Sequence, residues 1–228
     1  MALPLAAFGV WQVASARSFQ FFGGLTRAVA TDEKVVALTF DDGPDPAGAA
    51  ELLAVLAERR VSATFYLIGR DIEENPSLAR DIASAGHEIG NHTYSHERMV
   101  FISPGFAAEE VERTDRLIRD TGYTGDITFR PPNGKKLLVL PHYLSAHDRK
   151  TVMWDVEPNS FPEVDRSAEA ITDHTVARVR PGSIILLHGM YPDHEETRKA
   201  VGPIIDRLRA QGYRFTTVSE LLTLGPAR

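Results

Sequence analysis

The chain contains no cysteine. This absence excludes disulfide bonds, cysteine nucleophiles and thiolate ligands, so any bound metal must be held by nitrogen and oxygen atoms. It leaves the cellular compartment open, because exported bacterial proteins often lack cysteine as well. Internal repeats, low-complexity tracts and long runs of one charge are also absent.

There is no surplus of basic residues: 25 Lys and Arg face 31 Asp and Glu, which gives a formal net charge of −6. A nucleic-acid partner is therefore not expected, since phosphate binding requires a basic surface. With 43% hydrophobic and 25% charged residues, the composition is that of a globular protein. A length of 228 residues suits one α/β domain with a substantial core.

No apolar stretch is long enough to cross a bilayer, and the most apolar one, residues 2–14, is too short. Two interpretations of this stretch stay open: the remnant of a longer export or anchor segment, or a helix packed on the domain. Phe19, Phe21 and Phe22 favour packing, because such residues are poor occupants of a free linker. We predict an N-terminal segment at residues 1–30 and the main domain at residues 31–228.

Apolar runs alternate with amphipathic segments along the main domain. The predicted strands are residues 35–40, 63–68, 87–91, 127–129, 151–156, 183–188 and 213–218. The predicted helices are residues 46–60, 75–85, 103–121, 137–147, 167–180 and 195–211, followed by a terminal helix. This alternation predicts a parallel sheet covered by outer helices.

Both an open doubly wound sheet and a closed barrel fit this alternation. The polar residues favour one of them, because they follow the carboxyl ends of several strands: Asp41, Asp42, His92, Arg130, Asp155 and His188. A barrel collects its active site from many strands in this way, whereas an open sheet binds ligands at one switch point. We therefore predict a barrel of about seven strands.

Two histidines and a pair of carboxylates indicate a metal site. His92 and His96 are four residues apart, and on a helical turn such a pair can bind one ion. Asp41 and Asp42 are neighbours at a strand end, so they are expected to have different roles. Two imidazoles and one carboxylate leave open positions for water and substrate. The other carboxylate is then free to move a proton, which suggests a hydrolase.

Three further residues follow predicted strands. Arg130 lies in a proline-rich loop (FRPPNG, residues 129–134), where it could reach a carboxylate, and Asn133 keeps a backbone N–H that could serve an oxyanion. His188 ends an apolar strand, a position that favours proton transfer over packing. The remaining histidines are interpreted as surface or packing residues: His87, His142, His147, His174 and His194.

These segments resemble motifs of the polysaccharide deacetylases of the NodB-homology type, carbohydrate esterase family 4. Residues 39–44 (TFDDGP) resemble the first motif of that family, and residues 92–96 (HTYSH) resemble the second. Residues 129–134 resemble the third motif and residues 186–188 (LLH) the fifth. The resemblance extends from about residue 35 to residue 222, and it implies a distorted (β/α)7 barrel.

The resemblance also implies the roles of the candidate residues. Asp42, His92 and His96 would bind a divalent metal, commonly zinc in the family, with cobalt, nickel and manganese as alternatives. Such an ion lowers the pKa of a water molecule toward about 7, which makes it nucleophilic near neutral pH.

The proton-transfer roles are implied in the same way. Asp41 would be the general base, and Arg130 would hold it in place and keep it ionised. His188 would be the general acid that protonates the leaving amine. The backbone N–H of Asn133 would join the metal in stabilising the oxyanion, a contribution of about 3–4 kcal/mol per donor.

The chain departs from the family pattern where the substrate groove is expected. The third motif usually has an aromatic residue in place of Asn133. The fourth usually reads Asp-x-x-Asp-Trp, and its best match here is residues 157–161 (EPNSF). Ser160 stands where an Asp would partner the acid histidine, and Phe161 replaces the Trp. Either Asp155 or Glu157 could take over this partnering.

The leading hypothesis is a metal-dependent enzyme that removes acetyl groups from an N-acetylated glycan, such as peptidoglycan or a chitooligosaccharide. The alternatives are an O-acetyl esterase or small-amide hydrolase on the same fold, and a non-catalytic glycan-binding module. Family membership further implies work outside the cytoplasm, on cell-wall or extracellular polysaccharide.

Overall fold

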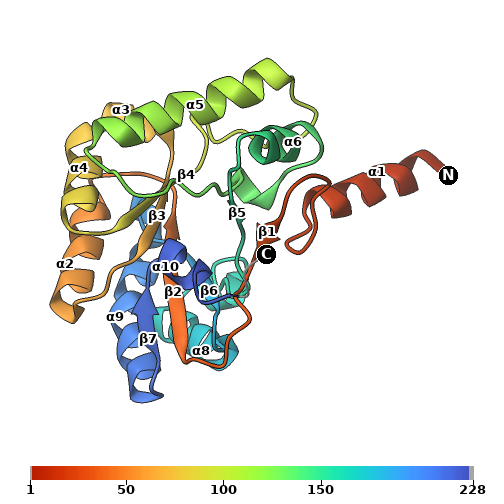
Figure 1. The fold of residues 1–228 in the computed structure, drawn as a ribbon. Coiled ribbons are helices and arrows are strands. Elements are labelled where there is room, and N and C mark those ends of the chain that lie inside the picture. Colours follow the sequence, from red (N-terminus) through yellow and green to blue (C-terminus); the bar gives the residue numbers. More distant parts are fainter. Residues whose placement is uncertain (1, 226–228) are drawn as a thin grey trace.

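The computed structural model describes residues 2–225, which form one parallel sheet with helices outside it (Figure 1). Its strands are β1 (Leu25–Thr26), β2 (Val35–Asp41), β3 (Thr64–Leu67), β4 (Glu88–Asn91), β5 (Thr151–Val152), β6 (Ile184–His188) and β7 (Arg214–Thr216). The longest of these, β2, is buried along its whole length, as expected for a strand covered on both faces.

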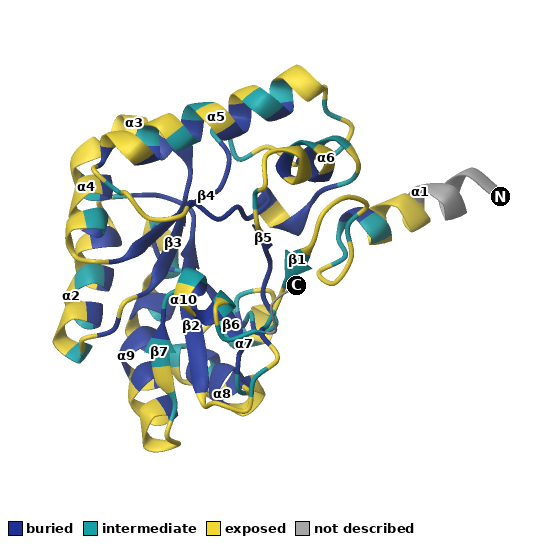
Figure 2. Ribbon diagram, in the orientation of Figure 1, coloured by how far each residue is buried: buried dark blue, intermediate teal, exposed yellow. Residues whose placement is uncertain are grey.

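Helices connect most of the strands and cover the outside of the sheet (Figure 1). They are α1 (Ala2–Ala14), α2 (Ala49–Arg59), α3 (Gly69–Glu74), α4 (Pro76–Ser84), α5 (Pro104–Asp120), α6 (Val139–Ala146), α7 (Pro162–Asp165), α8 (Ala168–Arg178), α9 (Glu195–Ala210) and α10 (Val218–Leu222), with 3-10 turns at Pro132–Gly134 and Pro192–His194. The strands β2–β6 appear almost entirely dark blue in Figure 2, while the helices are exposed on their outer faces. The amphipathic helices therefore shield the apolar strands from solvent.

The strand pairings run around a ring. On one side of β2 the order is β3 and then β4, and on the other side β6. Beyond β4, Phe129 bridges Asn91 on one side and Thr151 of β5 on the other. The predicted α/β barrel with parallel strands is confirmed, and its distortion lies in this region, where a single residue replaces a full strand.

Residues 25–28 close the ring between β5 and β6. In β1, Leu25 pairs with Thr151 of β5, and two residues further on Ala28 bridges Ser183, just before β6. A direct bridge from Val156 to Ile185 supports the same closure. Part of the predicted N-terminal segment is thus hydrogen-bonded into the barrel, while the boundary at residue 30 stays a prediction.

Side chains alternate along β2 between the outer layer and the barrel interior. Val36, Leu38 and Phe40 belong to the large outer core that the helices cover. Val35 and Ala37 belong to a smaller inner cluster, which also contains Trp154. The same alternation turns Asp41 to the inner side, at the carboxyl end of the barrel.

Some predicted elements are wrong or incomplete. Residues 127–129 do not form a strand, since only Phe129 pairs, and residues 151–156 are a strand only at Thr151–Val152. The sequence pattern also missed β1, α3 and α7. These elements are short, and their few residues carry no clear period.

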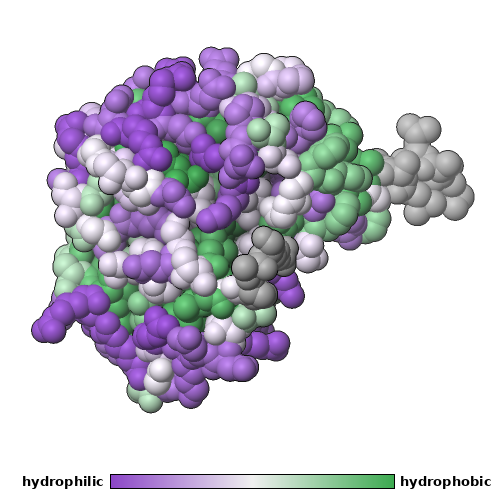
Figure 3. Space-filling model, viewed as in Figure 1, coloured by the Kyte–Doolittle hydropathy of each residue, from purple (hydrophilic) through white to green (hydrophobic). Residues whose placement is uncertain are grey.

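The helix α1 extends away from the barrel (Figure 1). Within its described part Phe8, Val10 and Trp11 are exposed, and Figure 3 shows a hydrophobic surface on this side of the molecule. Its last residue, Ala14, is buried at 2% exposure, so the end of the helix packs on the domain. Among the described residues, no helix combines the length and the apolarity that a bilayer span needs.

Candidate active site

The turn that follows β2 presents two carboxylates in different directions. Asp41 ends the strand, whereas Asp42 has a positive φ of 76° and Gly43 one of 70°. A Cβ at Gly43 would lie 2.8 Å from Cγ of Met190, so glycine is required by space as well as by conformation. A side chain at positive φ is uncommon outside functional turns, and here it separates Asp42 from Asp41.

Asp41 forms a buried ion pair with Arg130. The guanidinium Nη1 donates to Oδ1 of Asp41 at 2.6 Å, and the side chains are 0% and 3% exposed. The second oxygen, Oδ2, lies 3.7 Å from Nε2 of His92. One oxygen of Asp41 is thus bound by Arg130, and the other faces the histidines.

Arg130 is held on every side. Nη1 also donates to the hydroxyl of Thr39 at 2.8 Å, and Nε and Nη2 donate to the carbonyls of Val152 and Met153. Its guanidinium carbon lies 4.0 Å from the centre of the Tyr66 ring, close enough for a cation–π contact. This number of partners leaves the guanidinium one orientation, which directs it at Asp41.

His92 follows β4 directly and is buried at 2% exposure. Its Nδ1 lies 2.7 Å from the carbonyl oxygen of Arg130. A carbonyl can only accept, so Nδ1 carries the proton and Nε2 keeps its lone pair. Nε2 lies 3.7 Å from Oδ1 of Asp42. This arrangement of a histidine with one nitrogen fixed by a backbone carbonyl is typical of metal ligands.

His96 reaches the same point from a loop, and the prediction of a helical turn for residues 92–96 is wrong. Thr93 and His96 have positive φ values of 67° and 61°, which break any helix. The hydroxyl of Thr93 accepts from the backbone N–H of His96 at 3.1 Å, and Glu110 accepts from two further N–H groups of the loop, those of Tyr94 and Ser95. Side-chain acceptors therefore replace the helical hydrogen bonds.

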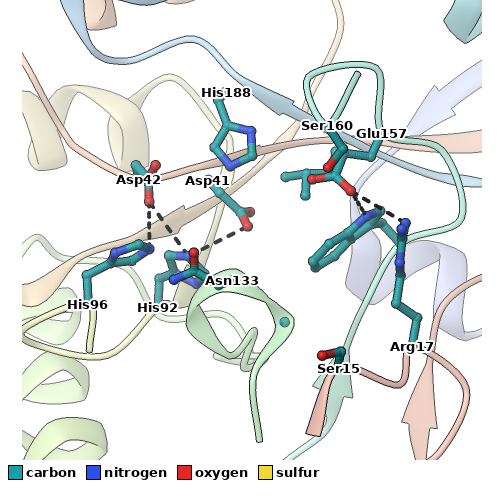
Figure 4. A pocket seen from close by; sticks show the side chains of 13 residues that line it. Ser15, Arg17, Asp41, Asp42, His92, His96, Asn133, Glu157, Ser160 and His188 are labelled. Atoms are coloured by element: carbon teal, nitrogen blue, oxygen red, sulfur yellow. Dashed lines mark hydrogen bonds and ion pairs between the residues drawn. The ribbon is translucent and has the colours of Figure 1, made fainter. Parts of the chain in front are cut away.

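The three predicted metal ligands lie together. One donor atom each of Asp42, His92 and His96 falls within 4.8 Å of the others, and Nε2 of His96 is 3.2 Å from Oδ1 of Asp42 (Figure 4). Oδ1 of Asp42 is buried and has no hydrogen-bond partner among the described residues. A buried carboxylate oxygen without a donor fits a cation. This triad of one carboxylate and two imidazoles is consistent with a divalent metal site.

The pKa of His96 is shifted in the direction that suits a metal ligand. Burial lowers the pKa of His96, and repulsion from His92 lowers it further. The neutral imidazole is the form that binds a metal.

His188 lies beside Asp41. It ends β6, and the register of the parallel pair places His188 opposite Asp41. The backbone N–H of His188 donates to Oδ1 of Asn159 at 3.0 Å. The ring of His194 lies 5.9 Å from that of His188, and the interpretation of His194 as a surface or packing residue stays a prediction. The turn at Pro192–His194, absent from the sequence prediction, brings His194 to this position.

The two carboxylates considered as partners of His188 are engaged elsewhere. Asp155 accepts from the hydroxyl of Ser183 and from the backbone N–H of Ile184. Glu157 accepts from Nε1 of Trp154 at 2.7 Å and pairs with Arg17 at 3.4 Å. Neither arrangement is directed at His188.

The candidate base, acid and metal ligands open into one cavity of about 370 Å³. Its lining includes Asp41, the metal triad, His188, Asn133 and Ser160, together with the apolar Leu186 and Trp154. Asn133 has a positive φ of 54° within the 3-10 turn and lines the same cavity. Sequence reasoning missed Ser15, Arg17 and Trp154 as parts of this lining. No motif in the sequence indicates Ser15 or Arg17, because both reach the cavity from the N-terminal segment.

Comparison with known proteins identifies the family of the chain. The profile of the family described as "Polysaccharide deacetylase" matches residues 28–152. A peptidoglycan-N-acetylglucosamine deacetylase of Bacillus cereus is 34% identical over 203 residues, covering 88% of this chain and 93% of that protein. A chitooligosaccharide deacetylase of Rhizobium leguminosarum is 32% identical, covering 86% of each.

Solved structures of the same fold agree with these relatives. The Bc1960 peptidoglycan N-acetylglucosamine deacetylase superposes with a TM-score of 0.80 at 30% identity, covering 89% of this chain and 94% of that one. BA3943 from Bacillus anthracis, described as a CE4 family pseudoenzyme, superposes with a TM-score of 0.78 at 26% identity, covering 91% and 72%. Barrel, motifs and relatives lead to one conclusion: the chain belongs to the polysaccharide deacetylase family, carbohydrate esterase family 4.

Proposed function

We propose that this deacetylase hydrolyses N-acetyl groups of a glycan built from N-acetylglucosamine, such as peptidoglycan or a chitooligosaccharide, and releases acetate. The observation that carries the proposal is the position of Asp41. One oxygen accepts from Arg130 at 2.6 Å, while the other faces the triad at 3.7 Å from His92. A base so fixed next to a metal site is suited to accept a proton from water.

The metal in this proposal is zinc, held by Asp42, His92 and His96, with cobalt, nickel or manganese as substitutes. When bound, the ion supplies Lewis acidity toward a water molecule and toward the acetyl carbonyl. The residues fit it, because the set consists of nitrogen and oxygen donors and includes the unpartnered buried oxygen of Asp42.

The proton transfers fall to two neighbouring strand ends. Asp41 accepts the proton of the attacking water at Oδ2, and Arg130 stabilises the negative charge of Asp41 from the other side. His188, opposite Asp41 in register, donates a proton to the amine nitrogen as the C–N bond breaks. Arg130 acts through Asp41 and is a positioning residue.

The remaining groups orient the substrate. Asn133 lines the cavity from a turn between two prolines and Gly134, and we assign its backbone N–H to the developing oxyanion. Leu186 and Trp154 supply apolar lining for the acetyl methyl group. The carbonyl oxygen of the acetamide is then contacted by the Asn133 turn, and its nitrogen by His188 at the end of β6.

The place of action follows from the relatives. Those named as peptidoglycan deacetylases act, by their names, on a cell-wall polymer. We therefore assign this chain to a location outside the cytoplasm, where such a polymer is present.

The test is acetate release by the zinc- or cobalt-loaded protein from N-acetylglucosamine oligomers and from peptidoglycan. The proposal predicts release from at least one of these glycans, at a higher rate than from aryl acetates. The opposite order would favour an O-acetyl esterase. That second candidate is supported by Ser160 and Phe161, which depart from the fourth motif.

A non-catalytic glycan-binding role is the third candidate. The family includes the BA3943 pseudoenzyme, so the barrel alone does not carry activity. In this chain the residues that we assign as base, acid and metal ligands line one cavity, and a binding module has no need of the first two. Metal bound without acetate release from any acetylated substrate would favour the binding module.

A further inference from the structure

Residues 11–17, which we call the N-terminal strap, are bound to the two lysines that follow the Asn133 loop, and Ser15 and Arg17 line the cavity. The backbone N–H of Lys136 donates to the carbonyl of Ala14 at 3.0 Å, and its Nζ donates to the carbonyl of Ala16 at 2.6 Å. Lys136 is 2% exposed, and burial lowers its pKa to about 8. Burying an amine costs free energy unless the amine is hydrogen-bonded, and the partner of this amine is the strap.

The neighbouring lysine holds two other points of the strap. Nζ of Lys135 lies 3.4 Å from the centre of the Trp11 ring, a cation–π contact, and it also donates to the hydroxyl of Ser15. Two consecutive lysines after the Asn133 loop therefore join the strap to the site. Their partners lie about 120 residues earlier in the chain.

The strap ends at Arg17, which completes a polar cluster inside the cavity. Nη1 of Arg17 lies 3.4 Å from Oε2 of Glu157, and its guanidinium carbon is 5.3 Å from the Trp154 ring. The same oxygen of Glu157 accepts from Nε1 of Trp154. Figure 4 shows Arg17 and Glu157 across the cavity from His96, and Ser15 on the same side as Arg17.

This cluster has the chemistry of a sugar subsite. A sugar hydroxyl both donates and accepts, and the cluster offers guanidinium donors on Arg17 and a carboxylate acceptor on Glu157. The hydroxyl of Ser15 donates to the carbonyl of Trp11 and accepts from Lys135, so it offers a sugar its one remaining acceptor lone pair. The side chain of Arg17 is 45% exposed, so part of its donor capacity faces the cavity. Its charge is balanced by Glu157, so an incoming carboxylate gains little there, whereas neutral hydroxyls fit both partners.

We propose that Ser15, Arg17 and Glu157 form a second subsite that binds the hydroxyls of a sugar unit adjoining the one that is deacetylated. The inference rests on the proposed function for the identity of the ligand as a glycan. It makes the N-terminal strap a determinant of substrate length, and it assigns a preference for neutral sugars to this end of the cavity.

Calorimetric binding tests the subsite without depending on turnover. The full zinc-loaded chain carrying Asp41→Asn is titrated with N-acetylglucosamine hexamer and with monomeric N-acetylglucosamine, with and without Arg17→Ala. We expect Arg17→Ala to raise the hexamer Kd about tenfold and the monomer Kd less than about twofold, as for the loss of a charged hydrogen bond. Arg116→Ala, at a side chain 67% exposed on α5, is the control and should change neither.

Equal weakening of hexamer and monomer binding, no weakening, or no hexamer binding would overturn the subsite. Unchanged melting temperatures exclude a folding defect. Arg17→Lys should recover part of the affinity, because lysine keeps the positive charge but lacks the planar set of N–H donors of the guanidinium. Glu157→Gln sharpens the test: it frees Arg17, so a glycan bearing lactyl carboxylates should gain affinity relative to the neutral hexamer. An unchanged ratio would contradict the charge assignment. Failure of the proposed function is a separate result, namely hexamer binding by the parent chain without acetate release.

Discussion

One end of the cavity is carried by strands and the other by loops. Asp41 and His188 end two adjacent strands, and Arg130, fully buried, fixes the first of them through hydrogen bonds to the barrel backbone. At the other end Glu157 lies in a connecting loop, and its partner Arg17 belongs to a strap that packs on the barrel from outside.

The two ends of the cavity are expected to have different roles: the strand end carries the reaction, and the loop end determines which glycan is bound. Charge at the strand end is buried and held by several partners, so one substitution there removes the chemistry or leaves a buried charge unpaired. At the loop end the ion pair is partly solvated, and such pairs contribute little alone. Changes there should alter which glycan is bound while the reaction itself is retained.

The largest effect is expected from Asp41→Asn. The amide keeps the size of the side chain but cannot accept the proton, so kcat should fall by at least about 10³-fold. Zinc content should be unchanged, because Asp42 and the histidines are intact. Asp81→Asn, at an exposed residue of α4, is the matched control. Substantial activity in Asp41→Asn would mean that the base lies elsewhere.

The next effect concerns the metal. His96→Ala removes one of three ligands, and the zinc Kd measured by competition with a chelator should rise by more than about 100-fold. Activity should then depend on added zinc. His147→Ala removes an exposed histidine of similar chemistry and should leave the zinc Kd unchanged. Unaltered affinity in His96→Ala would exclude His96 from the ligand set.

A smaller effect is expected where the strap is fastened. Lys136→Met keeps the length of the side chain but removes the donor to Ala16. The strap should loosen, and KM for the N-acetylglucosamine hexamer should rise about two- to threefold with kcat little changed. Lys150→Met, at a side chain 58% exposed, is the control. A fall in kcat equal to the change in kcat/KM would place the strap in the reaction instead.

The smallest effect is on stability and lies outside the cavity. Nδ1 of His87 accepts from the backbone N–H of Ala63, and burial lowers the pKa of His87 to about 4. Between pH 6.5 and 4 the unfolded chain binds the proton and the folded chain does not, so stability falls as the pH drops through this window. Between pH 7 and pH 5 the urea midpoint of unfolding should fall less for His87→Gln than for the wild type. His142→Gln, at an exposed ring, should behave as wild type, and equal losses in all three would contradict the assignment.

The strand end of the cavity was predictable because its signals are local. A continuous apolar run marks β2, and the residues after it define the turn that separates Asp41 from Asp42. His92 and Arg130 likewise follow directly on buried segments. The spacing of His92 and His96 indicated the right pair but the wrong backbone, since the positive φ of Thr93 is not apparent from its residue type.

The loop end was not predictable, because its contacts join residues that are distant in the sequence. Arg17 pairs with Glu157 and Ser15 with Lys135, residues far apart in the chain, and no periodic pattern connects them. The closure of the barrel by Leu25 and Ala28 was missed for the same reason. Such contacts depend on the assembled barrel rather than on local preference.

The most direct test measures acetate release from N-acetylglucosamine hexamer and zinc content in the same sample of wild-type protein. The account predicts about one zinc per chain, held by the Asp42–His92–His96 triad, together with acetate release that exceeds release from the dimer. Stoichiometric zinc with no acetate from hexamer, dimer or peptidoglycan would contradict it.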